Sequence, residues 1–246
     1  MSISPEIRDR LIFALDVPDR AEAVRFVKLL DGLVGYFKVG LELFVREGPE
    51  VVRAVQEHTS AGIFLDLKLF DIPATVRGAL RSASSLKVQM ITIHTSGGIA
   101  MLETAREVAA SGLQVLGVTL LTSHRPEDLA MLGFRDDIDL KRQVLERARL
   151  ARDAGCVGAV CSGEEVEGVK RACGADFKVV VPGIRSAESV VEQDDQARIV
   201  TPAKAIELGA DHIVVGRPIR DAKDPVSAAR NILHEIAQAV AGPHSA

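Results

Sequence analysis

The stretch LDLKLFDIPATV, Leu65–Val76, sets two aspartates and a lysine where an apolar strand would simply run into a loop. Asp66 and Lys68 lie two residues apart on the strand-like run Ile63–Lys68, so both side chains project from the same face. A lysine beside a carboxylate in apolar surroundings is costly unless it is paired or used. The stretch therefore predicts a strand with charges at its carboxyl end, followed by a helix over Pro73–Ser84. A strand-end ion pair beside a solvated turn is the plainer alternative.

This strand-to-helix unit recurs along the whole chain. Short β-branched runs predict strands over Leu11–Val17, Tyr36–Gly40, Ile63–Lys68, Met90–Thr95, Gln114–Leu121, Gly158–Cys161, Lys178–Pro182 and His212–Gly216. Amphipathic stretches between them predict helices over Ala21–Leu30, Pro49–His58, Pro73–Ser84, Ala100–Ala110, Leu140–Ala154, Glu164–Ala172 and Thr201–Leu208, with a last helix capped by Asp224 that runs to about Val240.

Strict alternation of strands and helices predicts a parallel sheet. Eight such units in 246 residues fit a closed (β/α)8 TIM barrel better than an open, doubly wound sheet. No linker-like or low-complexity segment divides the chain, so we expect an α/β protein with one domain over residues 1–246. Residues 241–246 are expected to form a disordered tail.

Composition narrows the class of protein. The formal net charge is −4, with acids and bases mixed, and no basic stripe indicates a nucleic-acid partner. No uncharged stretch reaches the roughly 18 residues that a membrane helix needs. The cysteines, Cys156, Cys161 and Cys173, are odd in number and lack a Cys-x-x-Cys spacing, which favours reduced, buried thiols in the cytoplasm over disulfides or a zinc site.

Charged residues gather at the predicted carboxyl ends of the strands, where barrel enzymes place their catalytic groups. Asp16 ends the first strand, Lys38 lies on the second, and Asp66 and Lys68 end the third. We expect Lys38, Asp66, Lys68 and Asp71 to lie close together with alternating sign. Each charge would then stabilise its neighbour by about 4 kcal/mol at an effective dielectric near 20, and the acids would favour the charged form of Lys68.

The ends of the last two predicted strands suit a phosphate group. Gly183 and Gly216 let backbone N–H groups approach an anion, and Arg185 or Arg217 can fork onto its oxygens. The acid- and serine-rich segment Ser186–Gln196 is interpreted as a lid that ends in Gln196. His94 is interpreted as a packed rim residue rather than a general base, and Glu42 as a surface group.

Short motifs in this chain resemble, in the same order, those of the orotidine 5′-phosphate decarboxylase family in its bacterial form. The resemblance runs from about Leu11 to the final helix. The motifs are Ala-Leu-Asp16, Phe-Lys38-Val-Gly, Asp66-Leu-Lys68-Leu-Phe-Asp71-Ile-Pro-Ala-Thr75-Val, Leu-Thr122-Ser123, Pro-Gly-Ile-Arg185, Asp195-Gln196-x-Arg198-Ile-Val-Thr-Pro and Val-Gly-Arg217-Pro.

The resemblance implies an enzyme that converts orotidine 5′-monophosphate to uridine 5′-monophosphate and carbon dioxide in de novo pyrimidine synthesis, with neither metal nor organic cofactor. Lys68 would donate a proton to C6 of the pyrimidine, Asp66 would lie near the departing carboxylate, and Lys38 would hold the ribose and the charge network. Asp16 would bind the ribose hydroxyls.

The resemblance also implies substrate contacts and a homodimer. Either Thr122 or Ser123 would meet the pyrimidine. The phosphate would be held by Arg185, Gln196, Gly216 and Arg217. Asp71, Ile72 and Thr75 would reach the active site of the other subunit.

Two alternatives stay open. Barrel relatives that share Asp-x-Lys-x-x-Asp, keto-gulonate-phosphate decarboxylase and hexulose-phosphate synthase, need a magnesium ion held partly by a glutamate on the second strand. Here that strand carries Lys38, which would repel a cation. A non-catalytic phosphosugar-binding barrel would keep the phosphate loops but lose the alternation of charge, which is intact in this chain.

Overall fold

Eight parallel strands close into a barrel in sequence order, β1 to β8, in the computed structural model of this chain. The structure describes residues 3–124, 131, 133, 139–185 and 200–242. The strands are β1 (Leu11–Ala14), β2 (Tyr36–Gly40), β3 (Gly62–Leu69), β4 (Met90–His94), β5 (Gln114–Val118), β6 (Gly158–Val160), β7 (Lys178–Val181) and β8 (His212–Val215). The pairing of β1 with β8 closes the ring. The predicted barrel is therefore confirmed.

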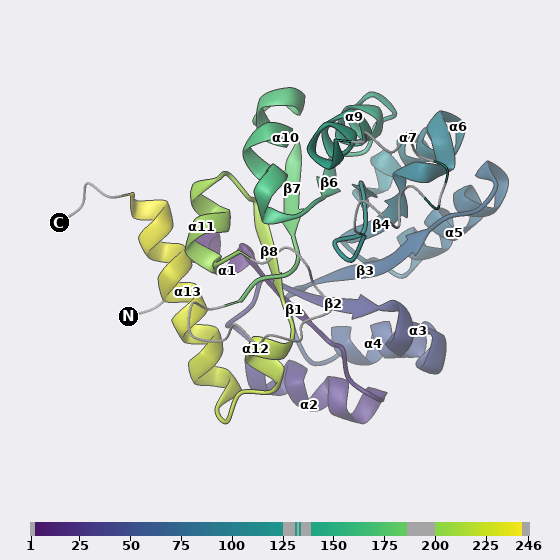
Figure 1. The fold of residues 1–246 in the computed structure, drawn as a ribbon. Helices are drawn as coiled ribbons and strands as arrows, with labels where there is room; N and C mark the ends of the chain where they lie inside the picture. The colour runs from purple at the N-terminus through teal and green to yellow at the C-terminus, as the bar shows by residue number, and fades with distance from the viewer. Residues whose placement is uncertain (1–2, 125–130, 132, 134–138, 186–199, 243–246) are drawn as a thin grey trace.

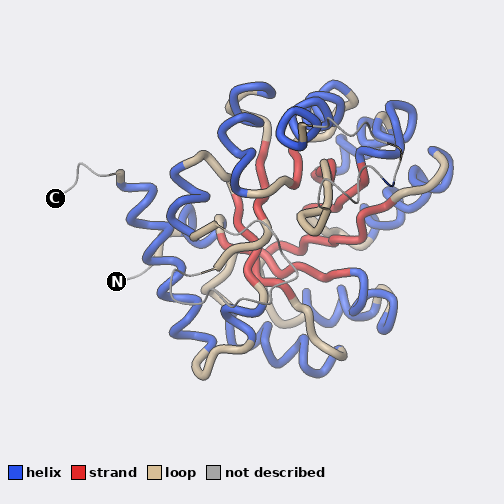
Figure 2. The backbone as a smooth tube through the Cα atoms, viewed as in Figure 1, coloured by secondary structure: helices blue, strands red, loops and turns tan. Residues whose placement is uncertain are grey.

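Helices surround the strands, as Figures 1 and 2 show. In the described ranges the longer ones are α2 (Arg20–Leu30), α5 (Pro73–Ser85), α9 (Leu140–Asp153), α10 (Val166–Cys173) and α13 (Pro225–Ala241). Shorter ones are α1 (Pro5–Asp9), α3 (Leu41–Glu47), α4 (Glu50–Gln56), α6 (Gly98–Leu102), α7 (Thr104–Val108), α11 (Pro202–Glu207) and α12 (Arg217–Arg220). Among these helices, none is long and apolar enough to cross a membrane.

The main core lies between the outer face of the barrel and the helices. Alternate strand residues such as Phe13, Phe37 and Ile63 are buried there against helical residues such as Phe26 and Leu80. Burying each large side chain contributes about 1.5–3 kcal/mol. The strand residues between them point the other way and fill the barrel interior, where they form a second apolar cluster. Each strand thus has one face toward the helices and one toward the barrel axis, which fixes which side chains can reach the rim.

Local details differ from the sequence-based expectations. Helices α1, α3 and α12 were not predicted, because each is only four to seven residues long and carries too little periodicity to detect. The expected strand over Leu11–Val17 ends at Ala14, where the chain leaves the sheet. The expected tail starts one residue too early, since Ala241 is the last residue of α13. Residues 243–246 lie outside the described residues.

Candidate active site

The charged residues of the rim belong to a layer directly above the apolar barrel interior. Phe64 and Met90 are buried in the interior cluster, with Tyr36 packed against them. Side chains two residues further along a strand point the same way. Lys38, Asp66 and Thr92 follow these three residues by two, so the same alternation that fills the barrel places a lysine, an aspartate and a threonine at its open end.

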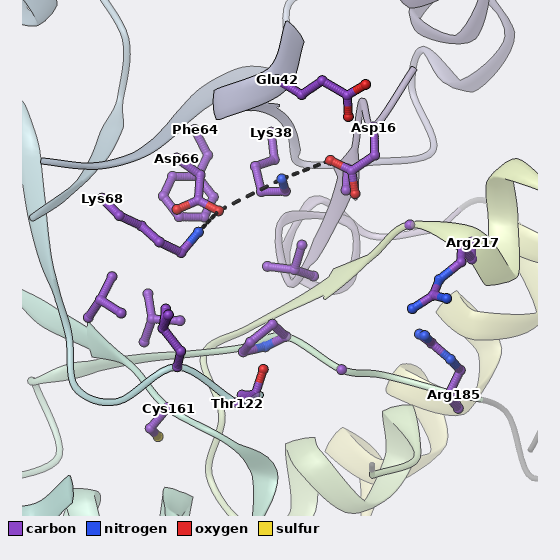
Figure 3. Close-up of a pocket in the computed structure, with 18 of the residues that line it drawn as sticks. Asp16, Lys38, Glu42, Phe64, Asp66, Lys68, Thr122, Cys161, Arg185 and Arg217 are labelled. Carbon is purple, nitrogen blue, oxygen red and sulfur yellow. Dashed lines mark hydrogen bonds and ion pairs between the residues drawn. The ribbon is translucent and has the colours of Figure 1, made fainter. Parts of the chain in front are cut away.

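Three side chains from β2 and β3, with Asp16 from the segment after β1, form a chain of alternating charge there (Figure 3). Lys68 Nζ lies 2.8 Å from Asp66 Oδ2, and Lys38 Nζ lies 3.7 Å from the same oxygen. Lys38 Nζ also donates to Asp16 Oδ1 at 3.1 Å. Only 13% of the Asp66 side chain is exposed, so this pairing takes place largely out of water, where an unpaired charge would be costly.

The lysines outweigh burial in setting the charge of Asp66. Burial on its own raises the pKa of Asp66, but the ammonium groups of Lys38 and Lys68, together with hydrogen bonds from Lys68 and Thr92, lower it below its usual value. The carboxylate is therefore ionised at neutral pH. A fixed negative charge between two ammonium groups can hold both lysines in place.

The backbone at Lys68 departs from regular strand geometry. The register between β3 and β4 shifts between Leu65 and Leu69, which marks an irregularity in the ladder. Lys68 has φ +50°, and its backbone N–H donates to Thr92 Oγ1 at 2.8 Å. From this backbone the Lys68 side chain points toward Asp66 (Figure 3).

Asp71 does not join this network within one chain, contrary to the expected four-residue cluster. Asp71 is exposed, and its Oδ1 accepts the backbone N–H of Ile72 at 2.6 Å. Ile72 and Thr75 are exposed on the same loop and on the first turn of α5. Within one chain the fourth charge of the network is that of Asp16, which accepts a hydrogen bond from Lys38.

A second polar group lies across the same cavity. Arg185 follows β7, and Arg217 is the first residue of α12, directly after Gly216. Both arginines line the cavity, and Figure 3 shows their guanidinium groups pointing toward one another. Gly183 has φ +76°, a left-handed conformation that favours glycine. The predicted phosphate residues Arg185, Gly216 and Arg217 are therefore brought together in space.

The cavity between the two groups has a volume of about 490 Å³, which lies within the usual range for small-molecule sites. Thr122 lines it, whereas Ser123 is exposed and is not among the lining residues. The structure thus favours Thr122 of the two residues left open by the sequence. The expected lid, 186–196, which includes Gln196, lies outside the described residues.

Sequence reasoning missed three residues at this site. Thr92 is fully buried beside Asp66 and could have been noticed as a polar, inward-facing residue between the apolar Ile91 and Ile93 of β4. Arg220 donates from Nη1 to the Asp16 carbonyl oxygen at 2.7 Å and so ties α12 to the end of β1. Glu42, interpreted as a surface group, lies on α3 at the cavity. Neither Arg220 nor Glu42 carries a local sequence signal, because α3 and α12 themselves were not predicted.

His94 ends β4 beside this network. Its ring centroid lies 5.9 Å from that of Phe70. Burial, with the nearby Arg147, His124 and Lys68, lowers the pKa of His94 to about 4. The imidazole is therefore neutral near pH 7. Over the ranges that the structure describes, no three His, Cys, Asp or Glu side chains gather as metal ligands would.

Comparison with known proteins identifies the family. The model of the orotidine 5′-phosphate decarboxylase / HUMPS family matches residues 9–232. An orotidine 5′-phosphate decarboxylase of Syntrophotalea carbinolica is 47% identical over 243 residues, covering 96% of this chain and 98% of the relative. The enzyme of the same name from Desulfosudis oleivorans is 45% identical, covering 95% of each chain.

A solved structure agrees with these relatives. The crystal structure of orotidine 5′-phosphate decarboxylase from Lactobacillus acidophilus superposes with a TM-score of 0.81 at 33% identity, covering 94% of this chain and all of the other. The matched segment includes every strand of the barrel and both polar groups of the cavity. This chain belongs to the orotidine 5′-phosphate decarboxylase / HUMPS family.

Proposed function

We propose that this protein decarboxylates orotidine 5′-monophosphate to uridine 5′-monophosphate and carbon dioxide, the step that serves pyrimidine synthesis. The observation that carries the proposal is the Lys68 ammonium 2.8 Å from Asp66, in a cavity whose other end presents Arg185 and Arg217. A nucleotide would lie between them, with its base at the lysine and its phosphate at the arginines. The family match and the names of the most similar relatives support the same reaction.

In this reaction the bond between C6 and the carboxylate breaks, and its electron pair stays on C6. The pyrimidine ring cannot delocalise that pair, so the positive charge of Lys68 stabilises it and the ammonium then gives C6 its proton. Lys68 is left neutral and regains a proton from solvent. The reaction needs no electron acceptor, since carbon dioxide leaves without the pair.

Asp66 and Lys38 support Lys68 in different ways. Asp66 fixes the ammonium of Lys68 by a 2.8 Å contact, and its charge repels the substrate carboxylate, a repulsion that is relieved as carbon dioxide departs. Lys38 bridges Asp66 and Asp16, which we assign to the ribose hydroxyls. Thr122 contacts the pyrimidine. Arg185, Arg217 and the backbone at Gly216 hold the phosphate, with Gln196 as a further contact from the sequence alone.

We infer that the protein works as a homodimer in the cytoplasm. Phe70 and Ile72 are 63% and 66% exposed on the loop after β3, and Leu41 and Val45 are exposed on α3. Large apolar residues so placed beside a site favour burial against a second copy. In that dimer Asp71, Ile72 and Thr75 would enter the site of the partner subunit. The three buried, free cysteines fit a reducing compartment.

Complementation between inactive variants tests the shared site. Lys68→Ala and Asp71→Ala chains, each inactive alone, are refolded together. Random pairing of equal amounts makes about half of the dimers mixed, and in each mixed dimer one site of the two has both residues intact. About a quarter of wild-type activity should therefore return. If the mixture stays inactive although mixed dimers form, Asp71 does not serve the partner's site.

Loss of the orotate chromophore tests the reaction itself. Purified protein is mixed with orotidine 5′-monophosphate in excess chelator, and uridine 5′-monophosphate and carbon dioxide are measured. Equal amounts of both products, formed at the rate of chromophore loss, are expected. Activity that appears only when magnesium is restored would place the protein with the metal-dependent sugar-phosphate relatives. Binding without turnover in either condition would make it a binding barrel.

A further inference from the structure

Thr92 touches both members of the Asp66–Lys68 pair. Thr92 lies on β4, faces the barrel axis and has no exposed surface. Its Oγ1 donates to Asp66 Oδ1 at 2.9 Å and accepts the backbone N–H of Lys68 at 2.8 Å. Thr92 is not among the residues that line the cavity, so it does not meet the substrate.

The direction of these two bonds is fixed by the groups involved. A backbone N–H can only donate and an ionised carboxylate can only accept, so the single hydroxyl proton of Thr92 must point to Asp66. The hydroxyl therefore bonds the ionised form of Asp66. The hydrogen bond from Thr92 is one of the causes that lower the pKa of this carboxyl against the effect of burial, after the charges of the two lysines and the hydrogen bond from Lys68.

The two oxygens of Asp66 have separate partners. Oδ1 accepts from Thr92, while Oδ2 meets the ammonium groups of Lys68 and Lys38 at 2.8 and 3.7 Å. This division sets the plane of the carboxylate and thus the position from which Oδ2 holds the Lys68 ammonium. Without the bond to Oδ1, the carboxylate could rotate about its terminal torsion, which has broad minima.

The second bond of Thr92 acts on the backbone of Lys68. At φ +50° a residue with a side chain is held in a sparsely populated region, at a cost of order 1–3 kcal/mol. Here the ladder between β3 and β4 is irregular, and the Lys68 N–H bonds to the threonine side chain. The Thr92 hydroxyl thus holds both the backbone of Lys68 and the Asp66 carboxylate to which the Lys68 ammonium bonds.

We propose that Thr92 is a positioning residue for the protonation step. Through one hydroxyl it sets the geometry of the Asp66–Lys68 pair and donates a hydrogen bond to the ionised carboxylate. The expected loss of kcat rests on the proposed decarboxylation. The effect of Thr92 on the position and the pKa of Asp66 does not depend on which reaction the protein catalyses.

The test compares Thr92→Val, which keeps size and removes the hydroxyl, with Thr92→Ser, which keeps the hydroxyl. Thr104→Val is the matched control, because Thr104 is also buried and its hydroxyl donates to the backbone carbonyl of Met101 on α6, away from the cavity. Thr92→Val should lower kcat by roughly 100-fold, the effect of a displacement of about 1 Å at a reacting group. Its affinity for uridine 5′-monophosphate should change by less than about threefold, since Thr92 does not line the cavity.

The dependence of kcat/KM on pH separates a positioning role from a loss of stability, because destabilisation alone would not shift its acidic limb. In Thr92→Val this limb should shift to higher pH, because Asp66 loses a bond to its ionised form. Thr92→Ser should restore both kcat and the limb. If Thr92→Val does not fold, Thr92→Cys replaces it, with a weak thiol donor and an intermediate loss expected.

Two results would overturn the proposal. One is a Thr92→Val enzyme with kcat within twofold of wild type and an unmoved acidic limb. The other is an equal loss of kcat in Thr104→Val. Failure of this proposal and failure of the proposed reaction can be told apart. An inactive wild type would refute the decarboxylation. A carbon-13 NMR titration of Asp66 does not depend on activity, and an Asp66 pKa that does not rise in Thr92→Val would refute the role of the hydroxyl.

Discussion

The two ends of the cavity hold their charges in opposite ways. At the ends of β1, β2 and β3, acids and bases alternate and bond to one another, with Lys68, Asp66, Lys38 and Asp16 in a continuous chain. At the ends of β7 and β8, two arginines point toward one another beside glycines. The first arrangement is complete without a ligand, which suits chemistry that depends on preorganised charge. The second gains stability when an anion enters between like charges, which suits binding.

Replacing Lys68 should give the largest effect, because it removes the proposed acid from the preorganised end. Lys68→Ala should lower kcat by roughly 10⁴-fold, the upper range for loss of a general acid. Lys87→Ala is the matched control, since Lys87 is exposed and also has a positive φ, +56°. Steady-state assays of both variants check this. Near-normal turnover by Lys68→Ala would assign the proton to another group.

Removing the negative charge at the centre of the same network should destabilise the fold. Asp66→Asn leaves Lys38 and Lys68 without their shared counter-charge, at a cost of about 3–5 kcal/mol when a buried pair is broken. Because the folded pKa of Asp66 is lowered, its contribution is present above the ordinary aspartate pKa of about 3.9 and is lost as pH falls through the folded value.

Denaturant unfolding of wild type and Asp66→Asn at several pH values measures that contribution. The difference between them should be constant above about pH 5 and shrink in more acidic solution. A difference that instead grows as pH falls would mean that Asp66 is held in its neutral form.

At the binding end, loss of one arginine should cost less than loss of Lys68. Arg217→Ala removes charge-assisted hydrogen bonds worth about 1.5–3 kcal/mol, or about 10–150-fold in kcat/KM, chiefly through a higher KM. Arg230→Ala, at an exposed position on α13, is the control. Initial rates over a range of substrate concentrations check this. A fall in kcat with KM unchanged would place Arg217 with the chemistry rather than with the phosphate.

His94 should have the smallest effect, although it lies beside the network. Its pKa of about 4 keeps the imidazole neutral from pH 5 to 8, so His94→Asn should leave the shape of the kcat/KM profile unchanged there. An unfolded histidine titrates near 6.5, so the wild type should lose stability as pH falls from 6.5 toward 4, and the variant should lose less. Disappearance of a kinetic limb near pH 6.5 in His94→Asn would contradict this assignment.

The parts predicted from sequence are those that periodicity encodes. All eight strands were located, and one cavity is lined by eight of the predicted site residues: Asp16, Lys38, Asp66, Lys68, Thr122, Arg185, Gly216 and Arg217. These residues lie at or just after the carboxyl ends of strands, and in a parallel barrel these ends all lie on one side, so the side chains come together. The short helices α3 and α12 have no such pattern, so Glu42 and Arg220 were out of reach.

The prediction for Asp71 was wrong within one chain for a different reason. Spacing on an ideal strand cannot show the positive φ at Lys68 or the register shift between β3 and β4, both of which come before Asp71. A tertiary contact accompanies this irregularity, namely the bond from the Lys68 N–H to Thr92, which lies 24 residues further along the chain. Thr92 itself was overlooked because threonine is common in strands and only its neighbours reveal its use.

Calorimetric titration of uridine 5′-monophosphate into Lys68→Ala and Arg217→Ala, set beside their turnover, tests the division of labour most directly. We predict that Lys68→Ala binds the product within a few-fold of wild type while turnover is lost, and that Arg217→Ala binds it about 10–150-fold more weakly while retaining measurable turnover. The reverse pattern, with product binding lost in Lys68→Ala and kept in Arg217→Ala, would contradict the account.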